Sequence, residues 1–160
     1  MERTRTPVVD GWFTDPAEGN GFRLLGTRCG ACGTVYFPRE DYCCRNPRCA
    51  GGELAEVPLS ARGRVWSYTD GRYRPPAPYV SDPAAPWEPY TLVAVELEAE
   101  RMVVLGQAAP GVGVADLAVG MEVEVVPGVL NEDAGTTWTT WHFRPVGTAG
   151  AGAQETGVRP

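Results

Sequence analysis

Three features of this 160-residue sequence predict a mainly β protein built from two small parts. All five cysteines lie in one stretch, RCGACGTVYFPREDYCCRNPRC, at residues 28–49. After Ser60 the pattern changes to five β-rich runs, several with the alternation of half-buried strands. One short helical segment precedes the fourth run, where an oligonucleotide/oligosaccharide-binding (OB) barrel usually has its helix. The sequence therefore predicts a cysteine-rich module followed by a five-stranded OB-fold barrel.

The overall composition is that of a small folded protein. Hydrophobic residues make up 43% of the chain and charged residues 21%, close to the values of globular proteins. No apolar run approaches the roughly 18 residues of a membrane helix, and the start MERTRTPVVDGWFTDP lacks the apolar core of a secretion signal. We therefore expect a cytoplasmic protein without a membrane partner, in which clustered cysteines bind metal rather than form disulfides.

The elements follow in order along the chain. Residues 1–21 form a polar, Gly- and Pro-containing N-terminal segment with a short helix expected near DPAEG (15–19). The cysteine-rich module spans 22–58, with short strands predicted at 22–29 and 34–37. The barrel spans 59–145, with strands predicted at 63–70, 89–98, 101–108, 121–128 and 136–145 and the helical segment at 114–120. The Gly/Ala/Thr-rich tail, 146–160, is expected to be flexible.

The connection between the first two barrel strands is unusually long. Its sequence, GRYRPPAPYVSDPAAPWEP (71–89), contains six prolines and shows no regular pattern. Compact domains rarely keep such a loop without a use for it. Two interpretations stay open: the loop folds over the mouth of the barrel, or it binds a partner or ligand.

The cysteine spacing predicts a metal site. Cys29-x-x-Cys32 followed by Gly33 is typical of a zinc knuckle, in which two thiolates sit on a tight turn. The second pair comes from Cys43, Cys44 and Cys49. We favour Cys44 and Cys49, because Asn46-Pro47 between them is turn-forming and can direct both sulfurs to one ion. Cys43 then stays a spare thiol, although the sequence leaves open whether it replaces Cys44.

Four thiolates would fill a tetrahedral coordination shell and leave no position for water or substrate, so the predicted site is structural. Residues 22–58 are too few to bury a stable core alone, and metal binding would supply much of their folding energy. Zinc is the expected ion, one per chain. Iron, as in a rubredoxin-type electron carrier, uses the same ligands, but nothing else in the sequence indicates a redox function.

Several short sequence motifs, in a fixed order along the chain, resemble those of a known protein family. They are the knuckle, VYFPR (35–39), a second pair of the form Cys-x-Asn-Pro-x-Cys, GRVWSYT (63–69), DLAVGMEVEVV (116–126) and FRP (143–145). Together they resemble the zinc-ribbon/OB-fold acyl-CoA-associated proteins over about residues 12–145. The resemblance implies a rubredoxin-like zinc ribbon ahead of the barrel, and a non-catalytic accessory subunit beside a thiolase-like or aldolase-like enzyme. In such proteins the barrel is thought to hold or channel the CoA substrate.

These implications give further expectations. For the phosphates of CoA, the candidate residues are Arg39, Arg72 and Arg74. For the enzyme partner, they are Tyr73, Tyr79 and Trp87 in the Pro-rich loop, with Tyr36 and Phe37 also expected to be displayed. A two-fold dimeric enzyme would carry two copies of this chain, giving a two-plus-two hetero-oligomer. We expect no catalytic residues, since the only histidine, His142, alternates with Trp141 and Phe143 as an ordinary barrel residue does.

Two other classes of function stay open. One is an OB-fold nucleic-acid-binding module with a structural zinc ribbon, in which Trp66, Tyr68, Trp138 and Trp141 would stack on bases. A net charge of −6 and the absence of lysine argue against binding to a phosphate backbone. The other class is a free-standing acyl-CoA binder without a protein partner.

Overall fold

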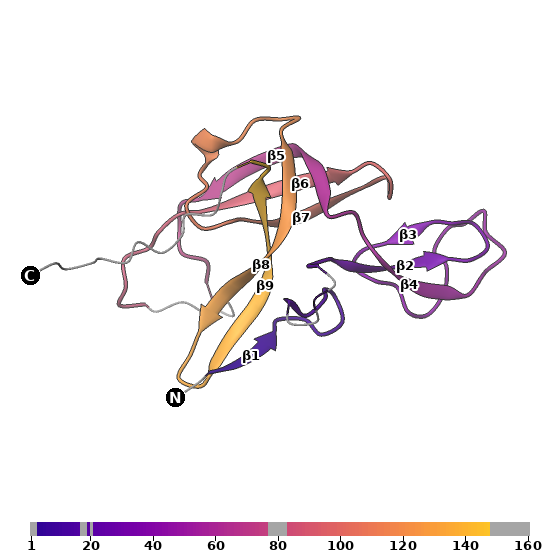
Figure 1. Ribbon diagram of the computed structural model, residues 1–160, viewed down its shortest axis with the longest axis horizontal. Helices are drawn as coiled ribbons and strands as arrows, with labels where there is room; N and C mark the ends of the chain where they lie inside the picture. Colours follow the sequence, from indigo (N-terminus) through magenta and orange to yellow (C-terminus); the bar gives the residue numbers. More distant parts are fainter. Residues whose placement is uncertain (1–2, 17–18, 20, 77–82, 148–160) are drawn as a thin grey trace, which may run out of the picture.

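The computed structural model describes residues 3–16, 19, 21–76 and 83–147, which form a small ribbon beside a barrel (Figure 1). Residues 17 and 18 of the helix expected near 15–19 lie outside these ranges, and so does the tail from residue 148. No helix within the described residues has the length and hydropathy needed to cross a bilayer.

The ribbon is a three-stranded antiparallel sheet in the order β3-β2-β4. Strand β2 spans Leu25–Cys29, β3 spans Val35–Tyr36 and β4 spans Leu54–Pro58. The first two lie inside the predicted strands, whereas β4 was not predicted from the sequence. Strand β4 pairs with β2 along its whole length, from Cys29 opposite Leu54 to Leu25 opposite Pro58. It therefore completes the ribbon and leads into the barrel.

The barrel has the five strands that the sequence predicts. They are β5 (Arg62–Gly71), β6 (Tyr90–Leu97), β7 (Met102–Ala108), β8 (Glu122–Glu132) and β9 (Thr136–Pro145). Their order is β5-β6-β7-β9-β8, with β8 returning to β5, so the sheet closes on itself. Strands β7 and β9 are parallel and the other pairs antiparallel, giving a mixed, OB-like barrel. A short 3₁₀ helix, η2 (Val114–Asp116), occupies part of the predicted helical segment.

Two departures from the prediction lie at one end of the barrel. Strand β8 continues past residue 128 to Glu132, because it keeps pairing with β9 across an irregularity between Val129 and Asn131. Strand β1 (Thr4–Pro7), in a segment without a predicted strand, pairs in parallel with β9. Its sequence, TRTP, shows no apolar alternation and contains proline, so the sequence gives no sign of a strand. The segment is a strand because it pairs with the edge of β9.

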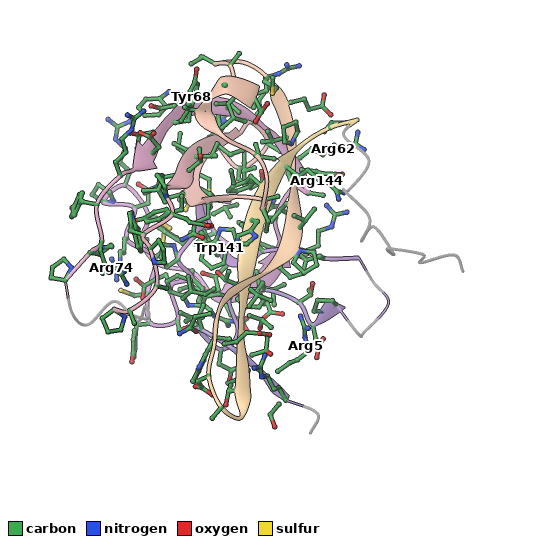
Figure 2. The ribbon with its side chains drawn as sticks, turned by 90° about the vertical axis from the view of Figure 1, so that its left-hand side faces the viewer. Arg5, Arg62, Tyr68, Arg74, Trp141 and Arg144 are labelled. Carbon is green, nitrogen blue, oxygen red and sulfur yellow. The ribbon has the colours of Figure 1, made fainter. Side chains whose placement is uncertain are left out.

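The ribbon, the N-terminal segment and the barrel share one hydrophobic core. Leu24 and Leu59, at the two ends of the ribbon, belong to the same buried cluster as the barrel residues Val65, Val93 and Phe143. An aromatic group formed by Trp12, Phe13, Phe37 and Trp141 joins the three parts, with ring centroids 5.5–6.2 Å apart. Figure 2 shows Trp141 in the middle of the molecule. Phe37 is therefore part of this joint, and the expectation that it is displayed for a partner is wrong.

Candidate metal centre

The first knuckle is a tight turn that returns the chain from β2 to β3. The amide of Gly33 donates to the carbonyl of Cys29 over 2.8 Å, and the amide of Cys29 donates to the carbonyl of Thr34 over 3.0 Å. Gly33 has φ 73°, a left-handed conformation that glycine adopts without steric cost. This turn holds Cys29 at the end of β2 and brings Cys32 back beside it.

The second knuckle is built by Asn46. Its side-chain oxygen accepts the Arg48 amide over 3.0 Å, and its carbonyl accepts the Cys49 amide over 3.0 Å. Both bonds curl residues 44–49 into a turn, as the Asn-Pro pair predicts. Gly52 follows this turn in the chain and lies close to Cys29. A Cβ atom at residue 52 would be 2.9 Å from Cys29 Sγ, which is too close, so this position requires glycine.

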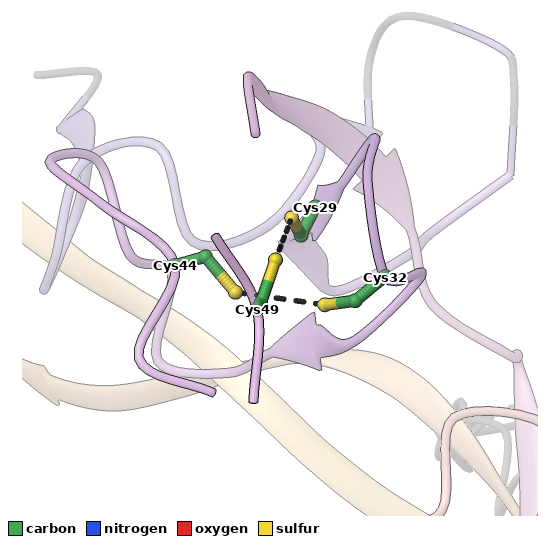
Figure 3. A group of neighbouring side chains, drawn as sticks. All are labelled: Cys29, Cys32, Cys44 and Cys49. Atoms are coloured by element: carbon green, nitrogen blue, oxygen red, sulfur yellow. Dashed lines mark hydrogen bonds between the residues drawn. The ribbon is translucent and has the colours of Figure 1, made fainter. Parts of the chain in front are cut away.

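The two knuckles bring four sulfurs together (Figure 3). The Sγ atoms of Cys29, Cys32, Cys44 and Cys49 all lie within 4.8 Å of one another. Two of these separations are 3.9 Å (Cys29 to Cys49) and 3.6 Å (Cys32 to Cys44). Cys43 is exposed and lies outside this group. The structure thus brings together the four cysteines that the sequence favours, and none of the five is in a disulfide.

The arrangement fits a tetrahedral metal ion. With metal–sulfur bonds of about 2.3 Å, the sulfurs of a tetrahedral site are about 3.8 Å apart, close to the separations seen here. Four thiolates are the donor set of structural zinc sites, and together they leave no open position on the ion. The site can hold an ion and cross-link the two knuckles, but it offers no place for a substrate.

The pKa values of Cys32 and Cys49 are shifted in opposite directions. Hydrogen bonds from the hydroxyl and backbone of Thr34 lower the pKa of Cys32 to about 6. A hydrogen bond from the Gly51 backbone lowers the pKa of Cys49, but desolvation and the neighbouring Cys32 and Cys44 sulfurs outweigh it and raise that pKa to about 12. Closely spaced thiolates repel one another, so a bound cation is needed for all four to lose their protons.

The arginines predicted to contact CoA do not form one cluster with free guanidinium groups. Arg39 donates to Asp41 over 2.9 Å, to Glu56 over 2.8 Å and to the carbonyl of Gly11 over 3.1 Å. The two carboxylates raise the pKa of Arg39, and its hydrogen bond to Gly11 ties the ribbon to the N-terminal segment. Arg72 is paired with Asp70 over 2.8 Å, although its side chain is 78% exposed. Arg74 lies over the ring of Trp87, 5.5 Å from its centroid, and donates to the carbonyl of Ala85.

The aromatic residues predicted to contact a partner have different surroundings. Tyr73 is 74% exposed. Trp87 is half-buried at the base of the Pro-rich loop, where its indole N–H donates to the carbonyl of Gly71 over 3.1 Å and its ring packs against Tyr90. Tyr79 lies outside the described residues. In Figure 2, Arg74 at this loop base lies across the molecule from Arg62 and Arg144.

The aromatic residues considered for nucleic-acid binding do not form a stacking surface. Trp66 is 60% exposed, but Tyr68 packs against the core. The indole N–H groups of Trp138 and Trp141 donate to Asp133 and to the carbonyl of Leu105, and Trp141 lies in the aromatic joint. His142 is only 3% exposed.

Comparison with known proteins agrees with this architecture. The zinc-ribbon family described as "ChsH2, rubredoxin-like zinc ribbon domain" matches residues 22–55. A DUF35 domain-containing scaffold protein of Methanocaldococcus jannaschii is 34% identical over 126 residues, covering 77% of this chain and 82% of the relative. The chain belongs to the DUF35 family. Its fold class, a mainly β protein with an N-terminal rubredoxin-like zinc ribbon and a five-stranded OB-like barrel, is confirmed.

Two further relatives of this DUF35 chain are subunits of enzymes by name. The benzoylsuccinyl-CoA thiolase subunit BbsA of Thauera aromatica is 44% identical over 55 residues, which cover 34% of this chain and 36% of that subunit. A chain of the solved "Ltp2-ChsH2(DUF35) aldolase" superposes with a TM-score of 0.57 and 27% identity, covering 88% of this chain and 98% of that chain. The resemblance read from the sequence motifs is thereby confirmed.

Sequence reasoning missed two residues beside the metal centre, Thr34 and Tyr36. Their hydroxyls lie 3.2 Å from Cys32 Sγ and Cys44 Sγ, respectively. The available signal was their spacing, because residues two apart on a strand point to the same face.

Proposed function

We propose that this DUF35 chain is a non-catalytic accessory subunit that pairs with a thiolase-like or aldolase-like enzyme acting on acyl-CoA. The main support is its likeness to the aldolase-associated DUF35 chain, which it covers over 98% of its length. The match to a thiolase subunit over 55 residues supports the same class of partner. A scaffold role also suits a chain that belongs to a family containing scaffold proteins.

The chemistry of the chain supports a non-catalytic role. A shell of four cysteines closes the proposed metal site to substrate. His142 is buried in the barrel, whereas the cysteines are in the ribbon. This separation does not support a catalytic cysteine–histidine pair that contacts a substrate. We infer that the partner supplies the catalytic groups.

We further propose that Cys29, Cys32, Cys44 and Cys49 hold one structural zinc ion. The ion would fix the two knuckles and, through Leu24 and Phe37, the way the ribbon packs against the barrel. Metal analysis of the purified chain should give about one zinc per chain. A chain that folds fully without metal would contradict this part of the proposal.

The CoA-handling role is proposed for the base of the Pro-rich loop. Arg72 is the best-placed candidate, because its guanidinium is exposed and, within the part of the chain that the structure describes, its ion pair is with Asp70. Calorimetry with CoA should show weaker binding by Arg72→Ala, and Arg101→Ala, at another exposed arginine, serves as the control. Equal affinities of the two variants for CoA would remove Arg72 from the proposed site.

The decisive experiment is reconstitution with the partner enzyme. The chain is co-expressed with the thiolase-like or aldolase-like enzyme of its own source, and the co-purified complex is assayed for acyl-CoA turnover beside each separate component. We expect turnover by the complex, little or none by the enzyme alone, and none by the isolated chain. A two-plus-two composition is expected from light scattering. Turnover by the isolated, zinc-loaded chain would refute the accessory role.

A further inference from the structure

Two hydroxyl groups lie beside the sulfur cluster and have no part in the proposed coordination. Thr34 Oγ1 is 3.2 Å from Cys32 Sγ, and the Tyr36 hydroxyl is 3.2 Å from Cys44 Sγ. Cys32 and Cys44 are themselves neighbours, with sulfurs 3.6 Å apart. Thr34 immediately precedes strand β3 and Tyr36 ends it, and both side chains point toward the sulfur cluster.

Each hydroxyl also accepts a hydrogen bond from the second knuckle. The backbone amide of Arg45 donates to the Tyr36 oxygen over 3.0 Å, and the side-chain amide of Asn46 donates to Thr34 Oγ1 over 3.5 Å. A hydroxyl that accepts one hydrogen bond keeps its own proton to donate. A cysteine that ligates a metal is a thiolate without a proton, so the sulfur must be the acceptor. The direction of both hydrogen bonds is thereby fixed.

We propose that Thr34 and Tyr36 are positioning residues of the metal centre, whose hydroxyls donate to the Cys32 and Cys44 thiolates and slow the loss of the metal. A divalent ion with four thiolates carries a net charge of −2, and each donated hydrogen bond spreads that charge over more atoms. The hydrogen bonds that the two hydroxyls accept from Arg45 and Asn46 connect them to the second knuckle, so the hydroxyls also restrain Cys44 against Cys32.

The four sulfurs differ in their exposure and in the donors beside them. Cys29 is buried, and Cys49 has the backbone amide of Gly51 as a donor. Cys32 is the exposed ligand, so water and chelators reach it most easily, whereas Cys44 is half-buried like Cys49. The Thr34 hydroxyl therefore acts where ligand exchange would begin.

The first test measures zinc affinity of the full-length chain by competition with a chelator. Tyr36→Phe and Thr34→Val remove one hydroxyl each while keeping the shape of the side chain, and Thr34→Ser restores a hydroxyl. Tyr42→Phe is the matched control, since Tyr42 is 95% exposed in the same segment. We expect each hydroxyl loss to weaken zinc binding about 10- to 100-fold, while Thr34→Ser and Tyr42→Phe bind like the wild-type chain. Wild-type affinity in both hydroxyl-deficient variants would overturn the proposal.

The second test separates hydrogen bonding from packing. In the cobalt-substituted chain, a hydrogen bond lowers the energy of the sulfur electrons, so its removal shifts the sulfur-to-cobalt charge-transfer band to longer wavelength. We expect this shift in Tyr36→Phe and Thr34→Val but not in Thr34→Ser or Tyr42→Phe. Weaker metal binding with an unshifted band would show a packing effect alone and would refute the proposed role.

If a variant does not fold, cadmium-113 NMR of the wild-type chain decides instead. The two hydroxyl protons should show coupling to the cadmium nucleus through the sulfur, and an absence of this coupling would count against the proposal. This inference rests on the proposed metal site and not on the partner enzyme. A wild-type chain that binds no metal would refute the proposed site itself, whereas unchanged zinc affinity and an unshifted band in the metal-bound variants would refute only this inference.

Discussion

At the scale of single residues, the neighbours Cys43 and Cys44 have different surroundings. Cys44 Sγ is 3.6 Å from Cys32 Sγ and 3.2 Å from the Tyr36 hydroxyl. Cys43, one residue earlier, is exposed and lies outside the group of four sulfurs. The turn at Asn46 determines which of the two faces the cluster, because it sets the path of the chain from residue 44 to residue 49.

Substitution of either residue by serine should therefore have different consequences. Cys44→Ser removes a proposed ligand, so zinc content should fall well below one per chain and the ribbon, residues 22–58, should lose protection from hydrogen exchange. Cys43→Ser should keep the zinc content and exchange pattern of the wild-type chain. Metal analysis together with hydrogen-exchange mass spectrometry makes the comparison. The opposite ranking of the two variants would assign the fourth ligand to Cys43.

His142 is a second residue with a measurable consequence. It is 3% exposed, and neither ring nitrogen has a hydrogen-bond partner among the described residues. Desolvation lowers its pKa below the ordinary value of about 6.5. Gln107 and Val126, the residues paired with it on the adjacent strands, carry no charge that could offset this. The folded barrel therefore holds the neutral imidazole.

This burial predicts a loss of stability on mild acidification. Below about pH 6.5 the unfolded chain binds a proton that the folded chain excludes, so the free energy of unfolding falls as the pH drops toward the lowered pKa. Above that pH the contribution is fully present. Urea unfolding at several pH values between 8 and 5.5 should show a steeper fall for the wild-type chain than for His142→Gln. Parallel curves would mean that His142 is not held neutral.

At the scale of elements, the aromatic joint of Trp12, Phe13, Phe37 and Trp141 links three segments that are far apart in sequence. Trp141 takes part in three of its ring contacts and also donates to the Leu105 carbonyl over 3.1 Å. That hydrogen bond bridges β9 and β7, which pair directly only at residues 107–108 and 142–143. Trp141 therefore closes the barrel and anchors the ribbon at the same point.

Truncation of Trp141 should show both effects. Trp141→Ala should lower the free energy of unfolding by about 3–5 kcal/mol, the usual cost of removing a large packed aromatic side chain. Trp66→Ala, at a tryptophan that is 60% exposed, should change it by about 0.5 kcal/mol or less. Chemical denaturation of both zinc-loaded variants gives the comparison. Equal effects would mean that the joint contributes little to the shared core.

The same elements show how far sequence reasoning reaches. Strands β5, β6, β7 and β9 were predicted within about one residue at each end, because they are β-rich runs with clear borders. Strands β1 and β4 were missed, because TRTP has no apolar alternation and LAEVP is a short run that ends in proline, so only their pairing with β9 and β2 shows them as strands. The four clustered cysteines followed from spacing and turn chemistry, whereas the Thr34 and Tyr36 hydroxyls needed the second knuckle in three dimensions.

At the scale of the whole molecule, the Pro-rich loop has a structured base. Arg74, Trp87 and Tyr90 pack together there, and Trp87 is bonded to Gly71 at the end of β5. Tyr73, beside this base, is the second most exposed large hydrophobic side chain among the described residues, after Tyr42. Exposed aromatic residues on a rigid base are common at the centres of protein interfaces. We infer that the loop is the part of the barrel that meets the enzyme.

Removal of residues 75–86 should therefore weaken the association with the partner enzyme, while Arg74 and Trp87 are kept. We expect a dissociation constant at least about tenfold higher, measured by surface plasmon resonance with the immobilised enzyme. A chain that lacks residues 148–160 is the control for shortening and should bind as the wild-type chain does. Unchanged binding after the loop deletion would place the interface on another surface.

The parallel pair of β1 and β9 has a consequence for the order in which the molecule assembles. Thr4 lies opposite Thr136, so β1 cannot pair until β9, more than a hundred residues later in the sequence, is available. During synthesis, the ribbon can take up its metal and β5–β8 can begin to pair, whereas residues 4–7 stay unpaired until β9 has left the ribosome. Contacts between such distant residues form slowly, because a long stretch of chain must first be ordered. Strand β9 therefore secures β1, which is synthesised long before it.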